Sequence, residues 1–196
     1  TTPLARILSL IPTTGYATED FWPINGLVSS GDGGCIQQFL DTVFHRSSLL
    51  STSITNIGFN LSSSSDNAGS VCLIDATYFQ NAQGIPPTGW VGQYPTPNQT
   101  GLASVMSPEA PDPVPGAATK GQPVSVYVEP QNTLVPTTFT LTDSLGNLVP
   151  GQILTNAQFP TNLTANQAYF VPTVGLKSGT TYTVQFVGTN NGAPLS

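Results

Sequence analysis

Charged residues, and basic ones above all, are scarce in this chain. Only 7% of the 196 residues are Asp, Glu, Lys or Arg, against about 25% in typical soluble domains. The four basic residues are scattered: Arg6, Arg46, Lys120 and Lys177. Nucleic-acid binding needs clustered Lys and Arg side chains that neutralise phosphates, so we exclude a nucleic-acid partner. The net charge of −6 argues equally against docking on anionic membranes.

Long apolar runs are absent too. No stretch of about 18 consecutive apolar residues occurs, so the sequence predicts no membrane span. Ser, Thr, Asn, Gln, Gly and Pro stand where charged residues usually do. The resulting neutral, hydroxyl-rich surface is typical of secreted and cell-surface proteins, and we predict an extracellular location.

Cysteine is limited to Cys35 and Cys72. An oxidising, extracellular setting favours one disulfide between them. The bond would close a loop of about 38 residues and add about 3–4 kcal/mol to stability in the chain-entropy model. The alternative is that both side chains act as small buried hydrophobic groups.

The best helical pattern starts at Cys35. Apolar residues then recur at three- and four-residue spacing, which predicts a core-facing helix through Ile36, Phe39, Leu40, Val43 and Phe44. Asp32 is its predicted N-cap. A shorter helix is predicted over 4–10, and 16–30 shows no period and is interpreted as a loop.

Strand patterns follow the helix. Residues 54–61 and 70–79 predict an antiparallel pair around a Ser-rich loop. Residues 80–121 contain eight prolines, which predicts an extended, irregular segment. We place a domain boundary within 116–121.

From Pro123 onward the pattern is β throughout. Short strands are predicted at 124–128, 139–141, 168–171 and 182–187. Turns every 8–12 residues predict a β-sandwich of immunoglobulin type. Tyr182 is placed to form a tyrosine corner, with its hydroxyl bonded to backbone near Leu176. The sandwich lacks a closing strand, so its open edge is predicted to allow a homo-oligomer or filament in which another chain supplies a strand.

His45 is the only histidine, so any metal site must draw its other ligands from carboxylates or from another chain. Glu19 is the candidate second metal ligand. Alternatively, His45 is a helix-end residue whose ring bonds a carboxylate or a carbonyl. At a helix C-terminus, His45 and Arg46 would also complement the helix dipole.

Other catalytic patterns are weak. No Gly-x-Ser-x-Gly occurs, and Ser47 and Ser48 lie too close to His45 to indicate a triad. Nothing selects Glu19 with Asp20 or Asp41 as a glycosidase pair. We therefore predict no catalytic residue and no cofactor. Four aromatic residues could line a carbohydrate or lipid groove, or simply pack: Phe21, Trp22, Trp90 and Tyr94.

The segment 41–50, Asp-Thr-Val-Phe-His-Arg-Ser-Ser-Leu-Leu, followed by Ile57-Gly58-Phe59, resembles bacterial members of the CAP superfamily. These are the cysteine-rich secretory, antigen 5 and pathogenesis-related proteins, also called SCP domains. Tyr94-Pro95 and 109–116 are similar to the Pro-rich tail of secreted relatives. Residues 176–184 resemble late strands of the Ig-like module that can follow. The resemblance covers about 16–190.

This resemblance implies an α+β chain: a partial CAP-like α/β sandwich over 1–115, then an all-β Ig-like sandwich over 116–196. His45 matches the second cavity histidine of the family. Glu19 falls where a cavity Glu is expected, although Thr18-Glu19-Asp20 replaces the usual Gly-Glu-Asn. The chain matches the second half of the domain, so we expect the helix with the first cavity histidine to lie upstream.

Three functions follow as expectations. The leading one is a secreted or cell-surface binding or structural module without catalysis. The second is a metal-dependent hydrolase or lipid-binding CAP domain completed by upstream residues. The third is a subunit of an extracellular assembly with strand donation between chains.

Overall fold

The structure is a computed structural model of the chain, and it describes residues 16–24, 33–52, 54–63, 70–78 and 86–196. Contacts divide the chain into two compact units. The first comprises Thr1–Leu40 and Ser48–Ile85, and the second comprises Asp41–Ser47 and Pro86–Ser196. The described residues are mostly β-sheet with two short helices.

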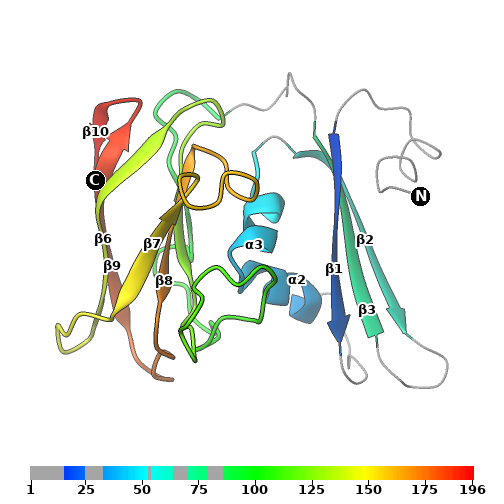
Figure 1. Ribbon diagram of the computed structural model, residues 1–196, viewed down its shortest axis with the longest axis horizontal. Helices are drawn as coiled ribbons and strands as arrows, with labels where there is room; N and C mark the ends of the chain where they lie inside the picture. The colour runs from blue at the N-terminus through cyan, green and yellow to red at the C-terminus, as the bar shows by residue number, and fades with distance from the viewer. Residues whose placement is uncertain (1–15, 25–32, 53, 64–69, 79–85) are drawn as a thin grey trace. The chain divides into compact units, whose positions relative to one another are not determined.

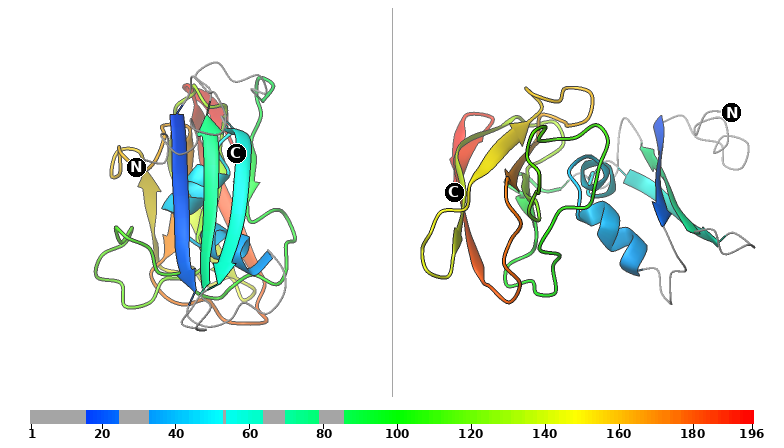
Figure 2. Two further views of the ribbon diagram at one scale, coloured as in Figure 1. Left: turned by 90° about the vertical axis from the view of Figure 1, so that its right-hand side faces the viewer. Right: turned by 60° about the horizontal axis from the view of Figure 1, so that its bottom comes forward.

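The first unit contains a three-stranded antiparallel sheet. Strand β3 (Ser70–Tyr78) lies between β1 (Tyr16–Ile24) and β2 (Ile54–Ser63) (Figure 2). The pairing of β2 with β3 confirms the predicted antiparallel pair. The prediction of a loop over 16–30 is wrong for β1, which pairs with β3 along its whole length. The reason is that β1 has no periodicity of its own and is fixed by its neighbour.

The predicted helix from Cys35 to Phe44 is interrupted. Helix α2 (Gly33–Leu40) ends before the segment 41–43, and a second helix, α3 (Phe44–Leu49), follows. In the first unit, Phe39 of α2 packs with Cys72 and Ile74 of β3 in a small buried cluster, against which Leu49 lies. The predicted helix over 4–10 and the predicted N-cap Asp32 lie outside the described residues.

Seven strands form the second unit, in two antiparallel sheets. Their bounds are β4 (Gly92–Tyr94), β5 (Val124–Tyr127), β6 (Leu134–Asp143), β7 (Gly151–Thr155), β8 (Gln167–Pro172), β9 (Tyr182–Asn190) and β10 (Ala193–Leu195). One sheet has the order β4-β5-β8-β7 and the other β10-β9-β6 (Figure 1).

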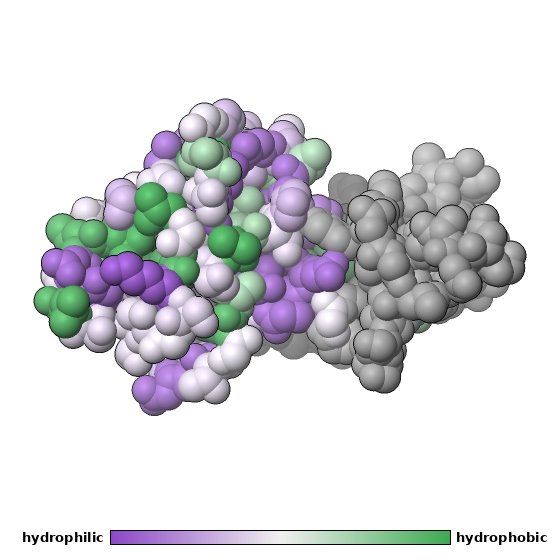
Figure 3. Space-filling model, turned by 90° about the horizontal axis from the view of Figure 1, so that it is seen from below, coloured by the Kyte–Doolittle hydropathy of each residue, from purple (hydrophilic) through white to green (hydrophobic). Residues whose placement is uncertain are grey.

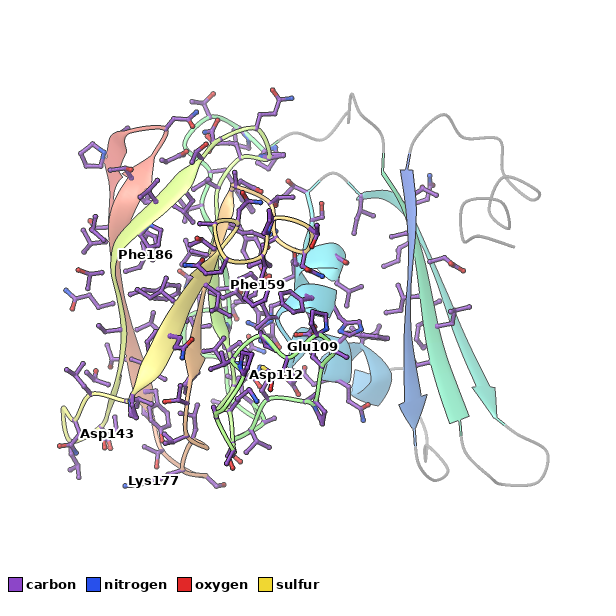
Figure 4. The ribbon with its side chains drawn as sticks, viewed as in Figure 1. Glu109, Asp112, Asp143, Phe159, Lys177 and Phe186 are labelled. Atoms are coloured by element: carbon purple, nitrogen blue, oxygen red, sulfur yellow. The ribbon has the colours of Figure 1, made fainter. Side chains whose placement is uncertain are left out.

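A hydrophobic core fills the space between these two sheets. Val124 and Phe170 come from the four-stranded sheet, and Phe139 and Leu141 come from the other. The Phe139 ring meets Phe170 at 5.9 Å between centroids and Phe186 at 5.1 Å, the second contact being edge-on. These side chains hold the sheets together as a sandwich, with Phe186 labelled between them in Figure 4.

The predicted tyrosine corner is present. The backbone N–H of Lys177 donates to the Tyr182 hydroxyl at 2.8 Å. Gly179, with φ +68°, makes the turn between them. The aromatic ring packs against the sandwich core while its hydroxyl fixes the loop that leads into β9.

The prediction that the closing strand is missing is corrected by β10. Asn191 and Gly192 both have positive φ, 49° and 82°, which suits a tight two-residue hairpin. The chain therefore turns back earlier than expected, and β10 pairs with β9 from Leu195↔Gly188 to Ala193↔Asn190. The closing strand exists but is three residues long.

From Pro86 to Gly121 the Pro-rich segment is irregular apart from β4, as predicted, and it is packed on the sandwich. The N–H of Gly121 donates to Pro172 O at 3.0 Å, and the N–H of Leu176 donates to Ser104 O at 2.8 Å. Val114 is 1% exposed. The Pro-rich segment from Pro86 onward therefore belongs to the second compact unit, together with Asp41–Ser47.

Candidate functional site

The carboxylate of Glu109 lies at the N-terminus of α3 (Figure 4). Its Oε2 accepts the N–H of Val43 at 2.9 Å. Its Oε1 accepts the N–H groups of Phe44 and His45 at 2.7 and 2.9 Å. The same Oε1 lies 2.8 Å from His45 Nδ1. The Glu109 side chain is 0% exposed and that of His45 is 19% exposed.

A distant carboxylate takes this position because the local sequence offers a poor cap. The first N–H groups of a helix have no partner within it. The residue before Phe44 is Val43, whose side chain has no acceptor, whereas Ser, Thr, Asp or Asn usually stands there. Glu109, 65 residues after Phe44, supplies both the acceptor oxygens and the negative charge that a helix N-terminus favours.

His45 therefore lies in the first turn of α3, and the expectation that it complements a helix C-terminus is wrong. The alternative expectation, that its ring bonds a carboxylate, is confirmed by the contact with Glu109. Sequence reasoning missed Glu109 as the partner. The only signal was its charge within an otherwise uncharged stretch of the Pro-rich segment, 102–111.

Residues of the Pro-rich segment and the residues just after it also hydrogen-bond to Asp41, which lies in the break between α2 and α3. The carbonyl oxygen of Asp41 accepts the N–H of Ser107 at 3.2 Å. Its buried carboxylate accepts Gln122 Nε2 at 2.8 Å. Asp41 is thus engaged on both its backbone and its side chain, which explains why α2 does not continue through it.

Arg46, also on α3, is fully buried. Its Nη1 donates to Pro123 O at 2.8 Å and to Ser125 Oγ at 3.2 Å. The guanidinium lies 4.7 Å from the ring centre of Tyr94 and 5.9 Å from that of Tyr169. A planar cation between aromatic rings is a stabilising arrangement. Arg46 therefore anchors the start of α3 to β4, β5 and β8.

A buried hydrogen-bond chain continues from Ser47. Gln167 Nε2 donates to Ser47 Oγ at 2.7 Å, and Ser47 Oγ donates to Asn162 O at 3.4 Å. The Tyr169 hydroxyl donates to Gln167 Oε1 at 3.0 Å. The same hydroxyl lies 2.9 Å from the Tyr127 hydroxyl. Burial raises the pKa of Tyr127, and raises that of Tyr169 more strongly. Ser47 serves this chain as both donor and acceptor.

The predicted metal ligands fall in different units. His45 belongs to the second unit, and Glu19 lies on β1 of the first, opposite Asp75 in the strand register. The Glu19 side chain is outside what the structure describes. Within the described residues, no three His, Cys, Asp or Glu side chains come together as a metal site.

The aromatic residues proposed for a groove have separate environments. Tyr94 is 8% exposed and packs on Arg46. Trp90 is partly exposed, and its ring lies so close to Gly92 that a Cβ there would come within 2.5 Å of it. The side chains of Phe21 and Trp22 are outside the described part. Tyr94 is thus a packing residue in this structure.

Cys72 is fully buried beside Phe39 and Ile74. Cys35 lies on α2, and its side chain is not among those described. The pairing of the two cysteines stays a prediction. It is compatible with the contact between α2 and β3 that Phe39 makes in the same cluster.

Among the described residues, neither helix has the length and apolar character needed to cross a membrane. Comparison of the chain with protein-family models, with curated proteins and with solved structures finds no match.

Proposed function

We propose that the second unit is an immunoglobulin-like sandwich. Two observations support this. The sheet orders β4-β5-β8-β7 and β10-β9-β6 correspond to the ABED and GFC sheets of a constant-type Ig domain, with the strands taken in chain order. In addition, Tyr182 at the start of β9, the sixth strand of this unit, forms the tyrosine corner.

For the part of the chain before the sandwich strands, which includes Asp41–Ser47 of the second unit, we propose a partial CAP-like α/β sandwich. The support is the succession of a helix, the His45-Arg46 pair, and then the antiparallel strands β2 and β3. This order matches the resemblance of residues 41–59 to that superfamily.

For the whole chain we propose a secreted or cell-surface binding or structural module that performs no catalysis. One observation carries the proposal: the Glu109 carboxylate is occupied by four donors, the backbone N–H groups of Val43, Phe44 and His45 and the His45 ring. A general base needs a lone pair directed at substrate. Glu109 instead accepts bonds that start a helix, and its side chain is fully buried.

Zinc titration tests this role. The purified chain and its His45→Gln variant are dialysed against chelator, and the melting temperature is measured with and without added zinc. We expect zinc to leave the melting temperature of both proteins unchanged. We also expect His45→Gln to melt at a lower temperature in either condition, because the amide weakens the contact with Glu109.

A zinc-dependent rise in melting temperature that disappears in His45→Gln would contradict the proposal. It would instead favour the metal-dependent CAP hydrolase, because ligand binding to the folded state stabilises it. Lys120→Gln is a control variant. It removes an ion pair with the half-exposed Asp112 and should change neither the zinc response nor, by more than a small amount, the melting temperature.

A further inference from the structure

Three tripeptides of this chain have the form Asn-x-Ser/Thr, in which x is any residue except proline. This form marks an asparagine that can accept an N-linked glycan. Because a glycan is bulky and hydrophilic, a folded chain carries it only on an exposed segment. The local structure therefore decides which of these asparagines is an acceptor. The three tripeptides are Asn60-Leu61-Ser62, Asn98-Gln99-Thr100 and Asn162-Leu163-Thr164.

The second tripeptide begins inside a tight turn that follows β4. The N–H of Gln99 donates to Thr96 O at 3.0 Å, which leaves Pro97 and Asn98 as the two central residues of the turn. Asn98 has a φ of 61°. Proline followed by a residue with positive φ is typical of a type II turn, and asparagine adopts this left-handed conformation more readily than most residues. The local sequence thus explains why the chain turns here.

The middle residue of this tripeptide fastens the turn, and the outer two face solvent. Gln99 Oε1 accepts the Thr96 N–H at 2.9 Å and the Thr96 hydroxyl at 3.2 Å. Gln99 Nε2 donates to the hydroxyl of the buried Tyr94 at 3.4 Å. By contrast, both Asn98 and Thr100 are exposed. The amide and the hydroxyl that define the tripeptide are therefore presented together on a turn that is anchored from behind.

The tripeptide at Asn162 is built into the interior instead. Leu163, its middle residue, is 2% exposed. The Thr164 hydroxyl donates to Asn166 Oδ1 at 2.5 Å and accepts a hydrogen bond from Gln167 Nε2 at 2.6 Å. Asn162 itself is half-buried. An enzyme could reach the amide and the hydroxyl of this tripeptide only after local unfolding.

The tripeptide at Asn60 lies within a sheet. It belongs to β2, and its backbone pairs with β3 from Asn60↔Leu73 to Ser62↔Val71. The hydrogen bonds of an antiparallel ladder hold such a segment extended, so it cannot turn outward into an enzyme without breaking them. Of the three asparagines, Asn98 is therefore the one that lies on an exposed turn.

The surface around this part of the sequence has no charged group of its own. The segment 91–107 contains no Asp, Glu, Lys or Arg, while Val91 and Val105 are 41% and 45% exposed. On the face shown in Figure 3, the coloured surface is mostly hydrophilic or near neutral, with separate hydrophobic patches. Soluble proteins usually keep such surfaces apart by charge. A glycan would supply the hydration that charged side chains provide elsewhere.

We propose that Asn98 is the acceptor of an N-linked glycan. The proposal rests on the extracellular location proposed above, because such glycans belong to secreted chains. In the transfer, the Asn98 amide nitrogen forms a bond to C1 of an oligosaccharide that is carried on a lipid diphosphate. The bond between C1 and the diphosphate oxygen breaks, and the lipid diphosphate leaves with the bonding electrons. The amide gives up one proton to a base of the transferring enzyme, and no oxidation or reduction takes place.

Glycan transfer to the folded chain tests the proposal. The purified 196-residue chain is incubated with a single-subunit oligosaccharyltransferase and a lipid-linked oligosaccharide. Intact mass counts the glycans, and peptide mass spectrometry locates them. We expect one glycan, at Asn98. Asn98→Gly should abolish the transfer while keeping the turn, because glycine tolerates positive φ. Thr100→Ala should also abolish it, whereas Thr100→Ser keeps the required hydroxyl and should retain the glycan.

Asn162→Gln is the control variant, and it should gain the same single glycan as the unchanged chain. Fragments from complete proteolysis of the chain are a second control. They should accept glycans at Asn60 and Asn162 as well as Asn98, because the fold no longer restricts access.

A folded chain that gains no glycan, or that gains one as readily at Asn162 as at Asn98, overturns the proposal. So does a glycan that persists in Thr100→Ala. Each of these results leaves the proposed non-catalytic function standing, because the zinc titration tests that function separately.

Discussion

At the scale of single residues, the structure depends on side chains that serve distant backbone. Glu109 replaces the missing N-cap of α3, whereas the Asp41 carboxylate accepts a hydrogen bond from the Gln122 side chain. Arg46 donates to a carbonyl of the segment before β5. In a chain with 7% charged residues, these three are all used internally. The conspicuous His45-Arg46 pair is therefore accounted for by packing and hydrogen bonding.

Removing the Glu109 carboxylate should be costly. In Glu109→Ala, three backbone N–H groups at the start of α3, those of residues 43–45, and the His45 ring lose a buried acceptor. We therefore expect the free energy of unfolding to fall by about 3 kcal/mol. Glu109→Gln keeps one acceptor oxygen and should lose less. Urea denaturation measures both. As a comparison, Asp112→Asn affects a half-exposed ion pair with Lys120 and should cost less than about 1 kcal/mol; equal losses in Glu109→Ala and Asp112→Asn would refute the capping role.

Glycine at 151 is required by the core. A Cβ at Gly151 would come within 2.3 Å of Phe170 Cζ, and Phe170 belongs to the buried cluster between the sheets. We expect Gly151→Ala to lower the unfolding free energy by about 1–3 kcal/mol through overpacking. Gly34→Ala is the control: a Cβ there meets nothing within 4 Å on α2, and alanine should stabilise the helix by about 0.5–1 kcal/mol. A stable Gly151→Ala would mean that the Phe170 ring can move aside.

At the scale of elements, the sequence could predict the helices and strands whose apolar residues recur at a regular spacing. Strands β2, β5 and β9 have alternating apolar residues and were predicted, as was the contact that anchors Tyr182. Strands β1, β4 and β7 were missed because they lack alternation and exist through pairing with β3, β5 and β8. The break between α2 and α3 was missed for a related reason: it depends on Ser107, Glu109 and Gln122, far along the chain.

The predicted link between α2 and β3 can be measured directly. If Cys35 and Cys72 form a disulfide, the intact mass of the purified chain rises by two hydrogens on reduction. Reduction, or a Cys35→Ser/Cys72→Ser double variant, should lower the unfolding free energy by about 3–4 kcal/mol, as expected for a loop of this length. Two alkylatable thiols in the native, unreduced protein would exclude the bond.

At the scale of the whole molecule, stability should depend on pH at both extremes. Hydrogen bonds lower the pKa of Asp143 and Glu129; the largest contributions come from the Asn147 side chain and from the Glu129 backbone. For Asp112, desolvation raises the pKa, but the bonds from Lys120 and Val114 outweigh it and lower the pKa overall. At the other end of the scale, burial raises the pKa of Tyr127 and Tyr169.

These pKa shifts determine how the free energy of unfolding should depend on pH. Carboxyls with a lowered pKa in the folded state stabilise it above their unfolded pKa of about 4, and that stability is lost as pH falls below it. Tyrosines with a raised pKa stabilise the fold below their unfolded pKa of about 10, and that stability is lost as pH rises beyond it. The urea concentration at the midpoint of unfolding should therefore fall at both acid and alkaline pH.

Tyrosinate absorbance supplies an independent reading of the alkaline end. Of the six tyrosines, Tyr127 and Tyr169 should ionise only when the chain unfolds. Ionisation of all six tyrosines in a chain that is still folded would contradict the raised pKa of Tyr127 and Tyr169. A urea midpoint that rises on acidification below pH about 4 would contradict the lowered pKa of the carboxyls.

The cap on α3 also determines the order in which the chain can fold. The carboxylate that starts α3 lies 64 residues after His45. An α-helix of six residues is too short to persist alone in water. During synthesis, a nascent chain that has emerged only through β3 lacks Glu109 and cannot form this turn. The histidine-bearing helix is thus a late product of tertiary assembly, completed only after the Pro-rich segment has left the ribosome.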